Sequence, residues 1–134
     1  MISKRLRNLF LVSLLLIYAH GVEEILGGFQ YSDSFMIFGA AIFQTTPEDF
    51  YWASHIIWWI SVPALFLLLN TSKWILPLLT LYGAVFFVEI HHIIKSIIAA
   101  SYYPGMITAA FYPILGYFYW SELISNFRKN IKKT

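Results

Sequence analysis

The sequence contains no cysteine, which excludes disulfide bonds, thiolate metal ligands and cysteine-bound iron–sulfur clusters. Charged residues are also scarce: Asp, Glu, Lys and Arg make up 12% of the 134 residues, against about a quarter in soluble domains. So few charges cannot cover a chain in which 59% of the residues are hydrophobic. The composition therefore excludes a soluble enzyme, a disordered regulator and a nucleic-acid-binding protein. It predicts an integral membrane protein surrounded by lipid.

Four long apolar segments predict the architecture. A helix of about 20 residues crosses a hydrocarbon core of about 30 Å, and four segments reach that length: 6–29, 47–69, 74–100 and 104–127. A further apolar run, 35–44, is too short to cross and predicts an interfacial or re-entrant helix in the first loop. We therefore expect an all-α protein with a single transmembrane domain, 1–134, built as a four-helix bundle.

The basic residues predict the orientation of these spans. Eight of the nine Lys and Arg residues lie before the first span, between the second and third, or after the fourth. The ninth, Lys95, lies near the outer end of the third span. The positive-inside rule then places both termini in the cytoplasm. The first segment also resembles a signal peptide with a cleavage site at 19–21, but its apolar character resumes at Ile25, so we interpret it as a retained helix.

Ionisable residues inside the predicted spans are candidates for function, because each costs several kcal/mol in a bilayer unless it is paired. The first three spans carry eight of them: His20, Glu23, Glu24, His55, Glu89, His91, His92 and Lys95. At a rise of about 1.5 Å per residue, His20, His55 and Glu89 fall at a similar depth in the outer half of the membrane. Three helices therefore deliver costly groups to one layer, which predicts that these groups meet.

The spacing of these residues favours a metal site. Glu89 and His92 lie three residues apart and share a helix face, as in the Glu-x-x-His step of di-iron bundles, whereas His91 points about 160° away from Glu89. His20 and Glu23 offer the same two groups in reverse order. We predict one or two ions of zinc, iron or manganese. The expected ligands are His20, Glu23, Glu24, His55, Glu89 and His92, with Glu23 or Glu24 as a catalytic base.

A purely structural polar network is the competing interpretation of these residues. Hydrogen bonds between helices contribute only about 0.6 kcal/mol in membranes, which is too little to explain two adjacent buried glutamates. The structural interpretation is stronger for His55, which could be a packing histidine. His91 could support the site or face the interface. We expect Lys95 to extend to the outer surface, although it could also neutralise carboxylate charge.

Several of these residues lie in a motif that resembles a known family. The string His20-Gly21-Val22-Glu23-Glu24 is similar to the signature of HXXEE-domain membrane proteins, and 89–92, 102–105 and 108–109 are similar to the later motif of that family. The resemblance implies a small helical membrane protein with a metal-dependent active site and names no substrate. It also gives weight to Tyr102 as a hydrogen-bond donor to the site.

These observations leave three functions open. The first is a membrane-embedded metalloenzyme acting on a lipid-like or apolar substrate, by hydrolysis with zinc or by oxidation or hydroxylation with two irons. The second is a component that transports protons or metal ions, which is disfavoured because the inner halves of the first three spans offer few polar steps, such as Ser13 and Thr80. The third is an accessory subunit of a larger membrane complex; a homo-oligomer is also compatible with the sequence.

Overall fold

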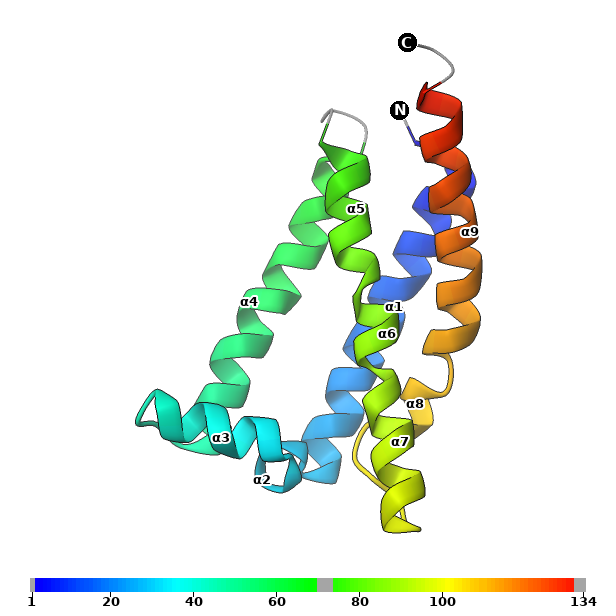
Figure 1. The fold of residues 1–134 in the computed structure, drawn as a ribbon. Coiled ribbons are helices and arrows are strands. Elements are labelled where there is room, and N and C mark those ends of the chain that lie inside the picture. The colour runs from blue at the N-terminus through cyan, green and yellow to red at the C-terminus, as the bar shows by residue number, and fades with distance from the viewer. Residues whose placement is uncertain (1, 70–73, 132–134) are drawn as a thin grey trace.

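The computed structural model describes residues 2–69 and 74–131, and every regular element within them is an α-helix (Figure 1). The predicted all-α class is confirmed for this part of the chain. In order, the helices are α1 (Lys4–Gly27), α2 (Phe29–Ser32), α3 (Ser34–Ile42), α4 (Pro47–Leu67), α5 (Ile75–Gly83), α6 (Val85–Val88), α7 (Ile90–Ala99), α8 (Met106–Ala109) and α9 (Tyr112–Ile131).

Three helical stretches are long and apolar enough to cross a membrane: Lys4–Gly27, Pro47–Leu67 and Ile75–Ala99. They correspond to the first three predicted spans. The fourth, predicted at 104–127, is not among them and is divided into α8 and α9. The division has a local cause. Pro113, the second residue of α9, has no N–H to donate to the carbonyl of Ala109, which leaves a hydrogen bond missing where α8 would continue into α9.

The helix ends follow from short-range chemistry. The Thr46 side chain accepts a hydrogen bond from the Asp49 N–H, and Pro47 occupies the first turn of α4, as the sequence predicts. Gly28 ends α1 with a φ of 73°, a left-handed conformation that favours glycine. The chain then enters α2 and α3, which run across the end of the longer helices (Figure 1). The predicted short helix in the first loop is thus present as α3.

The long helices pack unequally. Helices α1, α5 and α6 pack against α9 around a buried apolar core that includes Leu6, Phe10, Leu79, Tyr119 and Leu123. Helix α4 diverges from this group along much of its length (Figure 1), and its buried residues are Tyr51 and Val62. The described structure therefore has an open side next to α4. The predicted four-helix bundle is not confirmed.

The helical stretch 75–99 is interrupted at the candidate site residue Glu89. Its hydrogen-bond ladder tightens in two places. The N–H groups of Ala84 and Phe87 bond to carbonyls three residues back around the α5–α6 boundary, and the N–H of His92 bonds to the carbonyl of Glu89. Such tight turns interrupt a regular helix. The second interruption separates α6 from α7 and places Glu89 at the junction.

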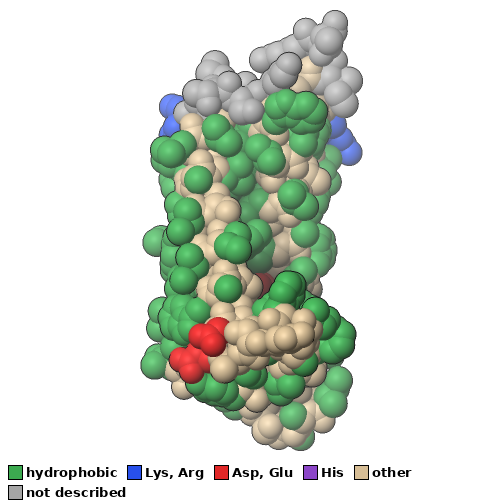
Figure 2. Space-filling view, turned by 90° about the vertical axis from the view of Figure 1, so that its left-hand side faces the viewer, with side chains coloured by type: hydrophobic (Ala, Val, Ile, Leu, Met, Phe, Trp, Pro, Cys, Tyr) green, Lys and Arg blue, Asp and Glu red, His purple; other side chains and the backbone are tan. Residues whose placement is uncertain are grey.

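Charge is segregated along the molecule. The two ends of the chain lie at the same end of the molecule (Figure 1), and basic side chains gather there (Figure 2). These include Lys4, Arg5, Arg7, Arg128 and Lys129, whereas Lys73, Lys132 and Lys133 lie outside the described residues. Figure 2 also shows a largely hydrophobic surface with acidic side chains at the opposite end and a hollow at mid-height. The prediction that both termini are cytoplasmic depends on this distribution of basic side chains.

Candidate metal centre

Four side chains converge on one point: two come from α1, one from the junction between α6 and α7, and one from α7. The Nε2 atom of His20 lies 3.0 Å from Oε2 of Glu89, and Nε2 of His92 lies 3.2 Å from the same oxygen. The two Nε2 atoms are 3.2 Å apart. Oε1 of Glu24 completes the group at 3.3 Å from His92 and 3.6 Å from His20. The predicted meeting of distant His and Glu residues is therefore confirmed for this group, the metal-centre group.

The size of the metal-centre group suits a metal ion. Bonds of about 2.0–2.1 Å from zinc to nitrogen or oxygen give a tetrahedron with edges of about 3.3–3.4 Å. The distances of 3.0–3.6 Å between the donor atoms scatter around that edge length. His20, Glu24 and His92 are at most 4% exposed, so the donors are withdrawn from competing water. Two imidazoles and two carboxylates could thus hold one divalent transition metal.

Hydrogen bonds behind the two imidazoles orient them. Nδ1 of His92 lies 2.5 Å from the carbonyl oxygen of Pro104, which can only accept, so this nitrogen carries the proton. Nδ1 of His20 lies 2.7 Å from Oγ1 of Thr108. The Thr108 hydroxyl donates to Glu23 at 2.6 Å, so its oxygen accepts from His20. Both rings therefore direct an Nε2 lone pair toward the centre, as metal-binding histidines do.

The facing lone pairs need a cation between them. Two neutral imidazoles with protonated Nδ1 atoms repel each other across 3.2 Å, and each also faces a carboxylate oxygen. A metal ion relieves this repulsion; the alternative is an extra proton on Nε2 of at least one ring, which donates to the other ring or to Glu89. The two states differ in composition, so elemental analysis distinguishes them.

Glu23 lies outside the metal-centre group. Its carboxylate accepts hydrogen bonds from the N–H groups of Ile107 and Thr108 at 2.9 and 2.8 Å, and from the hydroxyls of Thr108 and Tyr102. The sequence predicted Glu23 as a ligand or base. The structure instead joins it to His20 through Thr108, because its side chain turns toward α8. Tyr102 donates to Glu23, so its contribution to the site is indirect.

His55 contacts the edge of the metal-centre group. Its Nε2 lies 3.1 Å from Oε2 of Glu24, the oxygen that points away from the centre, and the Tyr51 hydroxyl donates to that oxygen at 3.1 Å. Nδ1 of His55 lies 2.9 Å from the Tyr51 carbonyl oxygen. His55 is therefore placed beside Glu24 and outside the set of four converging atoms.

His91 and Lys95 belong to neighbouring structures. The His91 Nδ1 bonds to the carbonyl of Val88 at 2.9 Å, and its ring contacts that of His92 at a tilt of 47°, with centroids 3.9 Å apart. Two alternatives were expected for Lys95: extension to the outer surface, or neutralisation of carboxylate charge. In the structure its ammonium pairs with the carboxylate of Asp33. Asp33 was not predicted as a site residue, since it lies in a loop outside the predicted spans.

Asp33 joins the loop helices to α7. Its side chain caps α3 by accepting hydrogen bonds from the N–H groups of Phe35 and Met36, and it also accepts from the Tyr103 hydroxyl at 2.8 Å. Burial by itself would raise the pKa of the Asp33 carboxyl. Hydrogen bonds from Lys95, Tyr103 and Met36 outweigh burial and hold this pKa below its usual range. Burial and Asp33 together raise the pKa of Tyr103.

The comparison with known proteins identifies the family. The model for "Protein of unknown function with HXXEE motif" matches residues 11–119, which include every residue of the metal-centre group. The chain belongs to the HXXEE family. No curated protein and no solved structure matches it. In this HXXEE protein the first and last motif residues, His20 and Glu24, face the centre, whereas Glu23 supports His20 through Thr108.

Three cavities are lined by residues of the metal-centre group. A small one of about 20 Å³ is lined by His20, Glu24 and Glu89 together with His55 and Tyr112, among others. A cleft of about 460 Å³ extends from Glu24, His55 and Glu89 to Asp33 and Lys95. Another of about 490 Å³ extends from His55 and Glu89 between α4 and α5–α6, on the open side of the fold. Residues beside the centre are thus accessible from two apolar clefts.

Proposed function

We propose that this HXXEE protein is a membrane-embedded, metal-dependent hydrolase acting on a lipid-like substrate. The observation that carries the proposal is the convergence of two imidazole nitrogens and two carboxylate oxygens whose orientation is fixed from behind. A polar network built only for stability has no need to face two Nε2 lone pairs across 3.2 Å.

In this proposal the protein spans the membrane four times, with α9 as the fourth span and both termini in the cytoplasm. The basic residues at the terminal end of the described molecule support that orientation. The metal-centre group then lies in the outer half of the bilayer, and α3 lies at the outer interface. Contacts with lipid follow from the many exposed apolar side chains, which include Leu15, Leu26, Ile57 and Leu81.

The distances suggest different roles for the two glutamates. The shortest contacts join His20, His92 and Glu89, at 3.0–3.2 Å. Glu24 is farther from both imidazoles, at 3.3 and 3.6 Å. We assign His20, His92 and Glu89 as metal ligands, a His₂Glu set known from zinc hydrolases, and Glu24 as the general base. Zinc bound there would lower the pKa of a bound water to about 7 and polarise a carbonyl group.

The environment of Glu24 suits a base that accepts a proton from water. The cavity of about 20 Å³ beside it has room for one water molecule. Tyr51 and His55 hold the other oxygen of Glu24, which fixes the orientation of the carboxylate. His55 also lines both clefts. In this position it can take the proton from Glu24 and donate it to the leaving group of the substrate.

Two other activities compete with hydrolysis. Two histidines and one carboxylate also hold iron(II) in oxygenases, so iron in the protein would redirect the proposal to oxidation. Transport of protons or metal ions is disfavoured because the half of the described core nearer the termini holds few polar side chains that could relay an ion. Ser13 and Tyr82 bond to each other there at 2.6 Å, and Thr80 bonds to its own helix. No further polar chain connects the centre to the terminal end among the described residues.

Elemental analysis of protein purified in mild detergent without chelator tests the proposal. We expect about one zinc per chain in the wild type and in His91→Ala, and a loss of at least tenfold in His20→Ala and His92→Ala. His91→Ala is the matched control because its ring adjoins His92 without facing the centre. Wild-type protein that is helical and free of transition metal would overturn the metal centre. Co-purification of a fixed partner would favour an accessory subunit.

A further inference from the structure

The two larger clefts beside the metal-centre group are parts of one groove. Both are lined by Phe35, Met36, His55, Val88 and Glu89. From these shared residues one cleft continues beneath α2 and α3, and the other continues between α4 and α5–α6. We call the combined feature the α4 groove. It borders the open side of the fold, where α4 diverges (Figure 1).

The two ends of the α4 groove differ in chemistry. One end contains Asp33 and Lys95, and the other is lined by Trp58, Leu81, Ala84 and Val85. Along the helical stretch 75–99, Lys95 lies about 9 Å from Glu89 in one direction, and Leu81 lies about 12 Å from it in the other. The groove therefore has an end with the Lys95–Asp33 ion pair, a reactive middle and an apolar end in a line.

We propose that the α4 groove binds an anionic single-chain acyl ester, with its headgroup at Lys95 and its acyl chain between α4 and α5–α6. This inference rests on the proposed hydrolase function and specifies its substrate. The ester linkage lies beside Glu24 and Glu89. Water adds its oxygen to the acyl carbon, the carbon–oxygen ester bond breaks, and the proton passes from Glu24 by way of His55 to the departing alcohol. The products are a fatty acid and an alcohol that carries the anionic headgroup.

The group at the headgroup end that can bind an anion is the partly exposed ammonium of Lys95, which already pairs with Asp33. Among the described lining residues Lys95 is the one Lys or Arg, and its side chain is 33% exposed. Its contact with Ser34 is long, at 3.4 Å, so that N–H can turn to a ligand. Asp33 is 1% exposed and already accepts from two backbone N–H groups, Tyr103 and Lys95. It therefore has little capacity left to bind a cationic headgroup.

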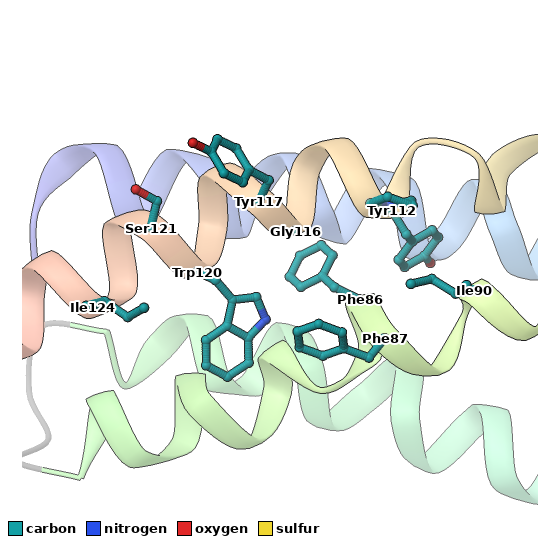
Figure 3. Close-up of a pocket in the computed structure, with 10 residues that line it drawn as sticks. Phe86, Phe87, Ile90, Tyr112, Gly116, Tyr117, Trp120, Ser121 and Ile124 are labelled. Carbon is teal, nitrogen blue, oxygen red and sulfur yellow. The ribbon is translucent and has the colours of Figure 1, made fainter.

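The structure contains a second apolar groove that serves as a comparison. It lies between α6–α7 and α9, has a volume of about 460 Å³, and is lined by residues such as Phe86, Phe87, Tyr117 and Trp120 (Figure 3). No residue of the metal-centre group lines it, and its described lining contains no charged side chain. A lipid attracted only by apolar surface would enter both grooves, whereas the proposed substrate selects the α4 groove.

Photo-crosslinking tests the proposal in full-length protein reconstituted into lipid nanodiscs. The probe is a monoacylglycerol phosphate with a diazirine near the end of the acyl chain, and labelled peptides are mapped by mass spectrometry. We expect label on Trp58 or on 81–85. Ala84→Trp fills the apolar end and should reduce this labelling at least tenfold. Ala53→Trp is the control, because Ala53 is exposed on α4 and does not line the groove.

An uncharged monoacylglycerol probe isolates the headgroup contact. Lys95→Gln should weaken labelling by the phosphate probe three- to tenfold and leave labelling by the uncharged probe unchanged. Label confined to Phe87 and Tyr117, an equal effect of the two tryptophan variants, or an equal effect of Lys95→Gln on both probes would overturn the substrate assignment. The metal content of the same samples is measured separately, so a failed metal centre is distinguished from a wrong substrate.

Discussion

The Nε2 atoms of His20 and His92 face each other at 3.2 Å, although both rings use their Nδ1 protons elsewhere. A cation at the centre converts this repulsion into attraction. In its absence the two imidazoles, with α1 and α7 behind them, must separate or take up protons. The metal-centre group should therefore connect metal binding to the stability of the fold.

Removing the metal should lower the thermal unfolding midpoint of the protein in detergent. A ligand that binds the native state at 1,000 times its dissociation constant adds about 4 kcal/mol to the free energy of unfolding. We expect chelator treatment to lower the midpoint and added zinc to restore it. His92→Ala should show neither change. An unchanged midpoint in the wild type after proven metal removal would contradict a stabilising metal.

Thr108 should control metal affinity from outside the centre. Its hydroxyl accepts from His20 and donates to Glu23, so Thr108→Val leaves the Nδ1–H of His20 without its acceptor. Losing such a partner of a metal-binding histidine weakens binding about 10–100-fold. A zinc competition titration measures the change. Thr108→Ser retains the hydroxyl and should restore most of the affinity.

Glu23 and Glu24 should respond differently to the same substitution. Glu23→Gln keeps part of the hydrogen bonding to α8, and we expect metal affinity to fall by about tenfold through the Thr108 contact. Glu24→Gln should abolish hydrolysis, since the amide cannot act as a base. Glu48→Gln, a change in an exposed carboxylate bonded to Tyr31, is the control and should alter neither property. Equal losses for Glu23→Gln and Glu24→Gln in both assays would contradict the separate roles.

Asp33 should make the stability of the loop helices depend on pH. Its pKa is lowered in the folded protein, so the carboxylate favours the fold above the ordinary value of about 3.9, and this contribution disappears as the pH falls through the lowered value. Asp33→Asn keeps an N-cap residue on α3 but loses the charge opposite Lys95. We expect it to lower the free energy of unfolding by about 1–3 kcal/mol at pH 7.

The difference in unfolding free energy between wild type and Asp33→Asn should narrow as the pH falls below about 3.9 and through the lowered pKa, because the carboxyl is protonated first in the unfolded chain and then in the folded protein. Unfolding in detergent, measured at each pH, provides the comparison. Asp33→Ala removes the cap as well and should cost more than Asp33→Asn at every pH. A constant difference between wild type and Asp33→Asn across this range would show that the ion pair with Lys95 contributes nothing.

Length and polarity explain how much of the fold could be predicted. The first three spans follow from uninterrupted apolar runs, and the centre follows from ionisable residues that are too costly to leave apart in lipid. The break between α8 and α9 was not predicted, although its cause, Pro113, is present in the sequence. A single missing N–H either bends a helix or ends it, and the packing of α8 on α1 and α7 decides between these outcomes.

The errors at the site have a different origin. A helical wheel gives the direction of each Cα–Cβ bond, so Glu23 and Glu24 appear about equally able to reach a centre. Glu23 turns away because the N–H groups at the start of α8 bind its carboxylate, and nothing local to residue 23 reveals that helix. Asp33 was missed because its partner, Lys95, is 62 residues away in the sequence.

Gly105 supplies the last constraint on the centre. Its φ is 88°, and a Cβ placed on it would lie 2.7 Å from Cε1 of His20 and 2.7 Å from Nδ1 of His92. Such distances are far inside van der Waals contact, so both imidazoles would have to move. Gly28 also has a positive φ, 73°, but the nearest atom to a Cβ there belongs to Tyr31 at 4.0 Å. A side chain added at either glycine would be strained by the positive φ, but a side chain at Gly105 would also collide with the two imidazoles of the centre.

Gly105→Ala should abolish stoichiometric metal binding, whereas Gly28→Ala should keep it. Both variants carry the strain of a left-handed alanine, about 1–2 kcal/mol, so a comparable fall in the unfolding midpoint is expected from that source alone. Metal content per chain, measured together with helicity by circular dichroism, separates the two effects. Full metal content in a folded Gly105→Ala protein would contradict the requirement for His20 and His92 at their observed positions, because neither ring could remain there beside an alanine.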